Sequence, residues 1–139
     1  MIAPPAKDLF SAVGRLVVLV DDPDAALAFY RDVLGFSVLH DQVTNGYRYL
    51  HIGLPGQDAV GLWLMPVVDD QDRELIGRQS GGRPLLVLYT ADLDLVGERL
   101  RERGVRVWGE QEDADSRSLH FADLYGNTVV VAELHGSSA

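Results

Sequence analysis

The side chains that could carry acid–base or metal chemistry are few and scattered. The chain has four histidines and no cysteine, which excludes disulfides, thiolate metal sites and a cysteine nucleophile. His40, His51 and His120 fall on predicted strands, and Glu133 lies near the end of the chain. Their separations do not give the close spacing of a typical pair of metal ligands. The residue pattern by itself therefore indicates no metal site, although a site assembled by folding stays open.

A second kind of chemistry needs no metal, only a base and a fixed positive charge. An imidazole can act as a general base near neutral pH, and His120 is the candidate. A guanidinium can stabilise an oxyanion or hold a carboxylate through two parallel hydrogen bonds. A histidine and an arginine together therefore predict isomerase or lyase chemistry as one alternative, provided that folding brings the two side chains together.

The elements that position these residues are repeated along the chain. The stretches "VLVDDPDAALAFYRDVLGF" (18–36) and "VLYTADLDLVGERLRERGV" (87–105) share an apolar run, an acidic cap, a helix and a closing glycine. Asp22 and Asp92 lie 70 positions apart, and the two closing glycines lie 69 apart. A duplicated structural unit explains this recurrence.

Each half of the chain is predicted to fold in the order strand, helix and three further strands. Expected strands cover 15–20, 36–42, 46–53 and 59–65 in the first half, and 84–91, 105–110, 117–123 and 128–134 in the second. This predicts one α+β domain over 1–139, with modules at 15–65 and 84–134. Together they would form a curved, mostly antiparallel eight-stranded sheet with helices on its convex side. Residues 66–83 are polar and are expected to be a partly mobile connection.

The composition of the chain limits which classes of partner and which cell compartment are expected. The net charge of −9 argues against nucleic acid or an anionic membrane, because both require a positive surface. No apolar run approaches the roughly 20 residues of a membrane-spanning helix. The N-terminal segment lacks the long apolar core of a signal peptide, so we expect a cytoplasmic protein. Residues 135–139 are expected to be disordered.

Two motifs resemble a known family. They are "DDPDAALAFYRDVLGF" after the first strand and "FADLYGNTVVVAEL" at the end of the chain. The second is similar to an F-x-D-P-x-G-N turn, with Leu124 at the usual proline. Over residues 13–134 the chain resembles the vicinal oxygen chelate superfamily, which includes glyoxalase I, extradiol dioxygenases, and bleomycin-resistance and fosfomycin-resistance proteins. The resemblance implies the fold described above, whereas many functions share that scaffold.

The resemblance also implies where a metal would be held. Active members typically bind a divalent metal through His, Gln or Glu on the first and last strands of the modules. The matching positions here are Arg15, Leu85 and Val130. A guanidinium and two aliphatic side chains offer no metal ligand. We therefore predict that the usual metal centre is absent and that the protein uses no cofactor.

The same positions predict which side chains face the concave surface, because strand residues alternate between the two faces of a sheet. The segment "YRYLHIG" also resembles the aromatic strand of fosfomycin-resistance enzymes. Together with Arg15 and His120, the expected ligand-binding residues are Val17, Tyr47, Tyr49, His51, Trp63, Met65, Tyr89 and Ser118. An apolar and aromatic trough with a few polar groups is typical of a small-molecule pocket.

These features favour a metal-free small-molecule-binding protein of the glyoxalase and bleomycin-resistance type. The resemblance implies a homodimer that holds an apolar or aromatic ligand, with Trp108 as a further stacking residue. The acidic balance of the chain favours a cationic ligand, whereas Arg15 favours an anionic one, so both remain open. The alternative is the metal-independent isomerase or lyase that uses His120 and Arg15.

Overall fold

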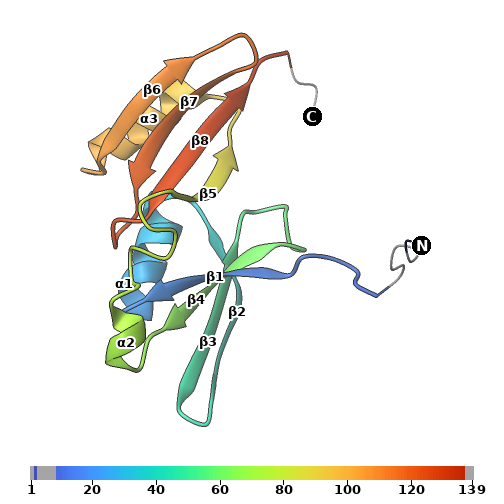
Figure 1. Cartoon of the computed structure of the whole chain (residues 1–139), viewed down its shortest axis with the longest axis vertical. Helices are drawn as coiled ribbons and strands as arrows, with labels where there is room; N and C mark the ends of the chain where they lie inside the picture. The colour runs from blue at the N-terminus through green and yellow to red at the C-terminus, as the bar shows by residue number, and fades with distance from the viewer. Residues whose placement is uncertain (1, 3–8, 137–139) are drawn as a thin grey trace.

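The structure, a computed structural model, describes residue 2 and residues 9–136 of the chain. In this part the strands form two four-stranded sheets, one above the other in Figure 1. The first sheet has the order β1-β4-β3-β2, with β1 (Arg15–Val20), β2 (Ser37–Thr44), β3 (Tyr47–Gly53) and β4 (Gly61–Pro66). The second has the order β5-β8-β7-β6, with β5 (Pro84–Tyr89), β6 (Val107–Glu112), β7 (Ser116–Ala122) and β8 (Thr128–Leu134).

The two sheets have the same topology. β1 pairs in parallel with β4, as β5 does with β8, and the remaining neighbours are antiparallel. The predicted α+β class with two βαβββ units is confirmed. Backbone hydrogen bonds divide the strands into two groups of four, and Figure 1 shows the edge strands β1 and β5 on the sides of the sheets that approach each other.

The first helix begins as the sequence predicts. Asp22 Oδ1 accepts hydrogen bonds from two backbone N–H groups of the first turn of α1 (Pro23–Ala28). The chain then continues as a π-helical turn, η1 (Phe29–Val33), which is a wider coil than the sequence predicts. It ends at Gly35, whose φ of +83° lies in the left-handed region that glycine tolerates best.

The repeated helix follows the same rules. Helix α3 (Leu93–Glu102) is capped by Asp92, whose carboxylate accepts the N–H of Leu95 at 3.0 Å. The helix packs on β6, β7 and β8 of the second sheet. Both predicted caps are therefore confirmed, and each fixes the point at which the chain leaves its first strand.

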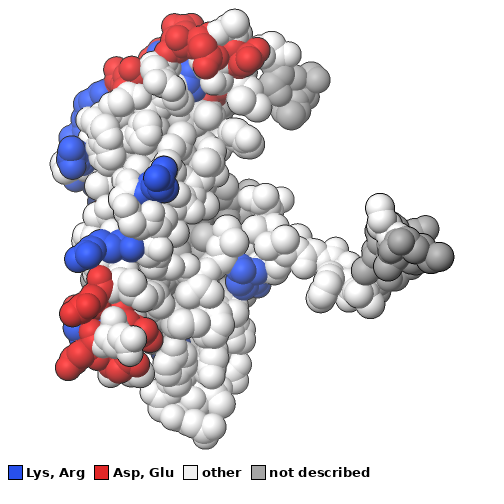
Figure 2. All heavy atoms as spheres, viewed as in Figure 1, with Lys and Arg blue, Asp and Glu red and all other residues white. Residues whose placement is uncertain are grey.

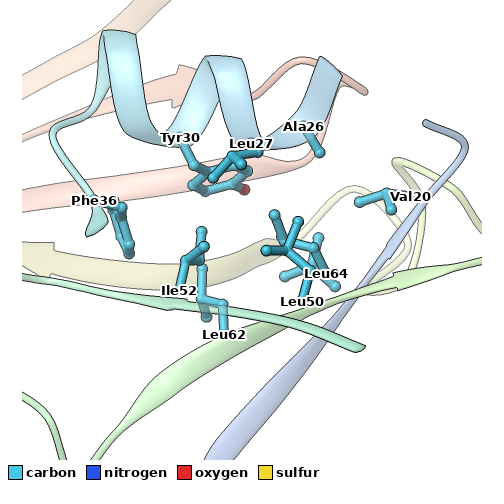
Figure 3. Packing of buried hydrophobic residues seen from close by; sticks show 10 residues of the cluster. Val20, Ala26, Leu27, Tyr30, Phe36, Leu50, Ile52, Leu62 and Leu64 are labelled. Carbon is cyan, nitrogen blue, oxygen red and sulfur yellow. The ribbon is translucent and has the colours of Figure 1, made fainter. Parts of the chain in front are cut away.

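Helix α1 covers one face of the first sheet and forms its core. Figure 3 shows Tyr30 and Leu27 above Ile52 and Leu64, all of which are buried. Fully burying a large apolar side chain stabilises a fold by about 1.5–3 kcal/mol. Among the described elements, no helix covers the opposite face of this sheet in Figure 1, which leaves that face for other contacts.

The first helix is also fastened to the second module. The buried Tyr30 hydroxyl donates to Asp123 Oδ2 at 2.7 Å. The Tyr125 hydroxyl accepts the N–H of Asp22 at 3.0 Å and donates to the carbonyl of Asp22 at 3.1 Å. Burial, and then the charge of Asp123, raises the pKa of Tyr30 well above its usual value. The two motifs that carry the family resemblance therefore bind each other.

The connection between the modules is more ordered than its polar composition predicts. It contains a short helix, α2 (Asp70–Arg73), and then returns to the free edge of β1. The Gln79 side-chain amide accepts the N–H of Leu19 at 2.6 Å and donates to the carbonyl of Val17 at 3.0 Å. The amide thus pairs with the strand edge as a neighbouring strand would, and it protects that edge.

Replacing Gln79 with alanine is expected to lower the free energy of unfolding by about 1–2 kcal/mol, because two backbone groups lose their partners. Gln79→Glu keeps the acceptor and loses the donor, so we expect roughly half that loss. Urea unfolding followed by tryptophan fluorescence measures both variants. An alanine variant as stable as the wild type would show that the amide contributes nothing to the edge.

The chain end differs in part from the prediction. The N–H of His135 donates to the carbonyl of Asp115 at 2.8 Å, so this residue is held in place rather than disordered. Residues 137–139 lie outside the described residues. In the part of the chain that the structure describes, no helix is long and apolar enough to cross a membrane.

Candidate functional site

The face of the first sheet that points away from the α1 core carries a row of aromatic and imidazole rings. Leu50 and Ile52 on β3 point into the core, so the alternating residues Tyr47, Tyr49 and His51 point to the other face. Trp63 of β4 pairs with His51 in the strand register. We call Tyr47, Tyr49, His51 and Trp63 the aromatic face.

The four rings of the aromatic face contact one another in succession, in the order Tyr47, Tyr49, Trp63 and His51. Ring centroids lie 5.0 Å apart for Tyr47 and Tyr49, 5.8 Å for Tyr49 and Trp63, and 5.4 Å for His51 and Trp63. These separations are in the range in which aromatic rings attract one another. The side chains are half-buried, so the face is preformed and still presents surface.

Arg15 adds a positive charge at one end of this face. Its Nε donates to His51 Nδ1 at 3.2 Å, and its Nη1 donates to the carbonyl of Gly14 at 2.7 Å. Burial, and then the charge of Arg15, lowers the pKa of His51. His51 is therefore neutral at pH 7, and because Nδ1 accepts a hydrogen bond, its proton is assigned to Nε2.

Two N–H groups of the aromatic face lack hydrogen-bond partners. Among the described residues, His51 Nε2 and Trp63 Nε1 are buried and bond to no other atom. A buried donor without an acceptor costs about 1–3 kcal/mol. An acceptor that reached these two N–H groups would therefore be stabilised at this face.

Sequence reasoning named His40 as a histidine on a predicted strand but did not place it beside His51, where it extends the row. It lies opposite His51 in the β2–β3 ladder, with ring centroids 5.3 Å apart. The signal was available in the Asn45-Gly46 pair, because a two-residue turn fixes the register of its hairpin. Both turn residues have positive φ, 53° and 78°, as this turn requires. Counting outward from the turn places His40 beside His51.

The second sheet carries a smaller counterpart of the aromatic face. His120 pairs with Val130 and Trp108 in the strand register, as His51 pairs with Trp63 and His40. His120 stacks on Trp108 with centroids 5.7 Å apart and an interplanar angle of 22°. The Arg106 guanidinium lies 4.4 Å from the Trp108 centroid. The duplication thus repeats the histidine and not the arginine beside it.

Gly109 makes this stack possible. Its φ is +68°, and a Cβ atom on it would lie 2.5 Å from His120 Nδ1. The strand register shifts at this point, between Trp108 and Gln111. A bulge glycine next to an aromatic residue was the sequence signal that could have indicated this close approach.

The other predicted residues lie around these two groups. Val17 pairs with Trp63, and Leu19 pairs with Met65, so Val17 and Met65 flank the tryptophan. Ser118 is half-buried and pairs with Ala132 in the second sheet. Tyr89 is 70% exposed at the edge strand β5. These placements leave their roles in ligand binding as predictions.

The structure does not bring Arg15 and His120 together within one chain. Arg15 bonds to His51 and Gly14 in the first module, whereas His120 stacks on Trp108 in the second. A base and an oxyanion-stabilising group must both reach one reacting centre. The isomerase or lyase alternative therefore has no geometric support from the described part of a single chain.

The residues at the usual metal positions do not fit a metal ion. Arg15 carries a permanent charge and no acceptor, and Leu85 and Val130 are aliphatic. Elsewhere in residue 2 and residues 9–136, no group of three or more His, Cys, Asp or Glu side chains is placed to hold one. The chemistry of the donor set argues against the family metal centre.

Both the sequence and the fold of this chain match a known superfamily. A model of the Glyoxalase/Bleomycin resistance protein/Dioxygenase superfamily matches residues 12–131. The chain belongs to this superfamily. An uncharacterised protein from Shewanella frigidimarina is 29% identical to it over 119 residues. These residues cover 84% of this chain and 88% of the relative. The family resemblance expected from the two motifs is thus confirmed.

Solved structures of other proteins share the fold of this chain. TnmS3, described as an antibiotic binding protein from Streptomyces sp. CB03234, is 30% identical with a TM-score of 0.75, covering 92% of this chain and 99% of TnmS3. The fosfomycin resistance protein FosX from Listeria monocytogenes is 15% identical with a TM-score of 0.69, covering 94% and 97%. The latter shows shared fold alone.

Proposed function

We propose that this superfamily member binds a flat aromatic small molecule on the aromatic face without a metal ion. The observation that carries the proposal is the row of contacting rings with two unpartnered N–H groups on a sheet face that no described helix covers. The exposed parts of these rings offer surface on which a flat ligand ring can stack. The antibiotic-binding description of TnmS3, at 30% identity, supports this proposal.

We further propose that the protein acts as a homodimer in the cytoplasm. The edge strand β5 exposes apolar side chains, among them Val87 at 53% and Tyr89 at 70%. An exposed apolar strand edge favours pairing with another chain. The absence of cysteine from the sequence is compatible with a reducing compartment.

The test uses 2-acetylnaphthalene as a flat aromatic probe, with binding measured by isothermal titration calorimetry. Trp63→Ala is expected to weaken binding about tenfold or more, because it removes both stacking and buried aromatic area. Val43→Ala is the matched control, since this side chain is 63% exposed and lies off the aromatic face. Recovery of unchanged probe after incubation is expected for a binding protein.

Two results would contradict the proposal. Equal affinity of wild type and Trp63→Ala would remove the aromatic face from the binding site. Conversion of the probe into a product by the protein would favour an enzyme instead.

A further inference from the structure

The nitrogen groups of the aromatic face are all presented as hydrogen-bond donors. Arg15 carries donors and no acceptor, and Trp63 carries a single N–H. His51 could present either a donor or an acceptor, but the bond from Arg15 Nε occupies its Nδ1 at 3.2 Å. The remaining nitrogen, Nε2, therefore carries the hydrogen. Arg15 thus acts as a positioning residue that sets the tautomer of the histidine.

The net charge of the chain is −9, so the position of the acidic side chains bears on which ligand charge the aromatic face favours. Figure 2 shows acidic side chains gathered near the β6–β7 end and around α2. Asp41 on β2 follows His40 in sequence, but both of its carboxylate oxygens bond to Arg48 at 2.9 Å. A cationic ligand would therefore meet the Arg15 guanidinium and two N–H groups at this face, with the ring faces and tyrosine hydroxyls as its attractive contacts in place of a carboxylate.

We propose that the ligand bound at the aromatic face presents an acceptor oxygen, as a carbonyl, phenolate or carboxylate, to Arg15, His51 and Trp63, and that cationic amines are rejected there. This inference rests on the proposed aromatic ligand site and specifies its chemistry. An acceptor oxygen can accept hydrogen bonds from the two N–H groups that have no partner within the described chain. A charged donor such as Arg15 strengthens these bonds when the oxygen is anionic.

The ligand also has to displace a neighbouring ring. His51 Nε2 and Trp63 Nε1 are closed to solvent, so an oxygen reaches them only when one of the covering side chains moves. Tyr49 lies against Trp63 with centroids 5.8 Å apart, and we take a change of its rotamer as the movement that opens the site.

Three naphthalene probes of the same shape test this inference. They are naphthalene-2-carboxylate, 2-acetylnaphthalene and (2-naphthyl)methylammonium, each titrated calorimetrically into the full chain at about pH 7.5, where the carboxylate and the ammonium are both charged. We expect the carboxylate and the ketone to bind at least about tenfold more tightly than the ammonium compound, because the latter offers no acceptor and meets a like charge.

Two variants test whether Arg15 causes the preference for the carboxylate probe over the ammonium probe. Arg15→Gln is expected to reduce the ratio of carboxylate to ammonium affinity to about threefold or less, whereas Arg31→Gln changes the same net charge on an exposed part of the first helix and leaves the ratio unchanged. In wild type, the chemical shift of the Trp63 indole N–H is expected to move with the two acceptor probes. The same indole signal also checks that Arg15→Gln is folded.

The outcomes separate the two proposals. Ammonium binding as tight as carboxylate binding, at a site that Trp63→Ala removes, would overturn the acceptor inference and leave the aromatic site intact. Failure of all three probes to bind would overturn the proposed function itself. A carboxylate preference that survives Arg15→Gln unchanged would also contradict this inference.

Discussion

Replacing Asp123 with alanine is expected to lower the free energy of unfolding by about 3–5 kcal/mol, since it leaves several buried donors without an acceptor. The Asp123 carboxylate is 5% exposed. It accepts hydrogen bonds from the Tyr30 hydroxyl, from the backbone N–H groups of Tyr125 and Asn127, and from the Asn127 side-chain amide. These bonds span 2.7–3.0 Å, so none is weak by geometry.

The loss is large because Asp123 serves two parts of the fold at once. Its bonds to Tyr125 and Asn127 shape the turn between β7 and β8, and its bond to Tyr30 holds η1 of the first module. Removal of the carboxylate therefore weakens a turn and a module interface together. The contributions of contacts that share one partner do not add independently. The alanine variant therefore measures the combined contribution of all the hydrogen bonds to Asp123.

Tyr30→Phe is the matched control for this effect. It removes one hydroxyl and keeps the ring, which packs beneath α1 in Figure 3. We expect a loss of about 1–2 kcal/mol from the hydrogen bond alone. Urea unfolding with fluorescence and circular dichroism measures both variants near neutral pH. A loss for Asp123→Ala no greater than that for Tyr30→Phe would show that the turn does not depend on the carboxylate.

Local sequence signals predicted the elements well. Strands β1 and β8 have the predicted bounds, 15–20 and 128–134, because a continuous run of Val and Leu with turn residues at its ends indicates a buried strand. Asp22 and Asp92 cap their helices as predicted. Each of these signals acts over a few residues, so one sequence contains enough information to find it.

Contacts between distant residues were harder to predict. The bonds from Gln79 to β1 join positions 60 and 62 apart in sequence, and a polar glutamine in a polar segment gives no sign of them. The π-helical turn after α1 is likewise set by packing of its residues against both cores. Tertiary contacts override local preference in such segments.

The sequence allowed the side chains of one strand face to be listed but not their arrangement in space, and their role in ligand binding stays a prediction. Alternation along β3 correctly places Tyr49 and His51 on one face, since the period of a strand is fixed. The pairing of Arg15 with His51 required the registers of β1 with β4 and of β3 with β4, which no turn in the sequence fixes. For this reason the residue types alone paired Arg15 with His120, which lies on the other sheet.

Replacing Gly77 with alanine is the second change with a large expected effect, about 4 kcal/mol or more. Gly77 has a φ of +78°, and a Cβ atom on it would lie 2.0 Å from the carbonyl oxygen of Tyr125. Backbone cannot move aside as the end of a flexible side chain can. The connection and the β7–β8 turn would have to separate, at the turn that Asp123 also organises.

Gly81→Ala is the matched control, because Gly81 lies in the same connection with a φ of +63° and a Cβ atom on it would meet no described atom within 4 Å. It isolates the cost of left-handed backbone for alanine, about 1–2 kcal/mol. Urea unfolding gives the difference between the variants, and equal losses would contradict the steric argument.

Gly77 precedes Gln79 by two residues, so its displacement should also release the edge of β1. In Gly77→Ala we expect faster hydrogen exchange at the Leu19 amide, which donates to Gln79. This result would show that the contact between Gly77 and the β7–β8 turn also stabilises β1, the strand that carries Arg15.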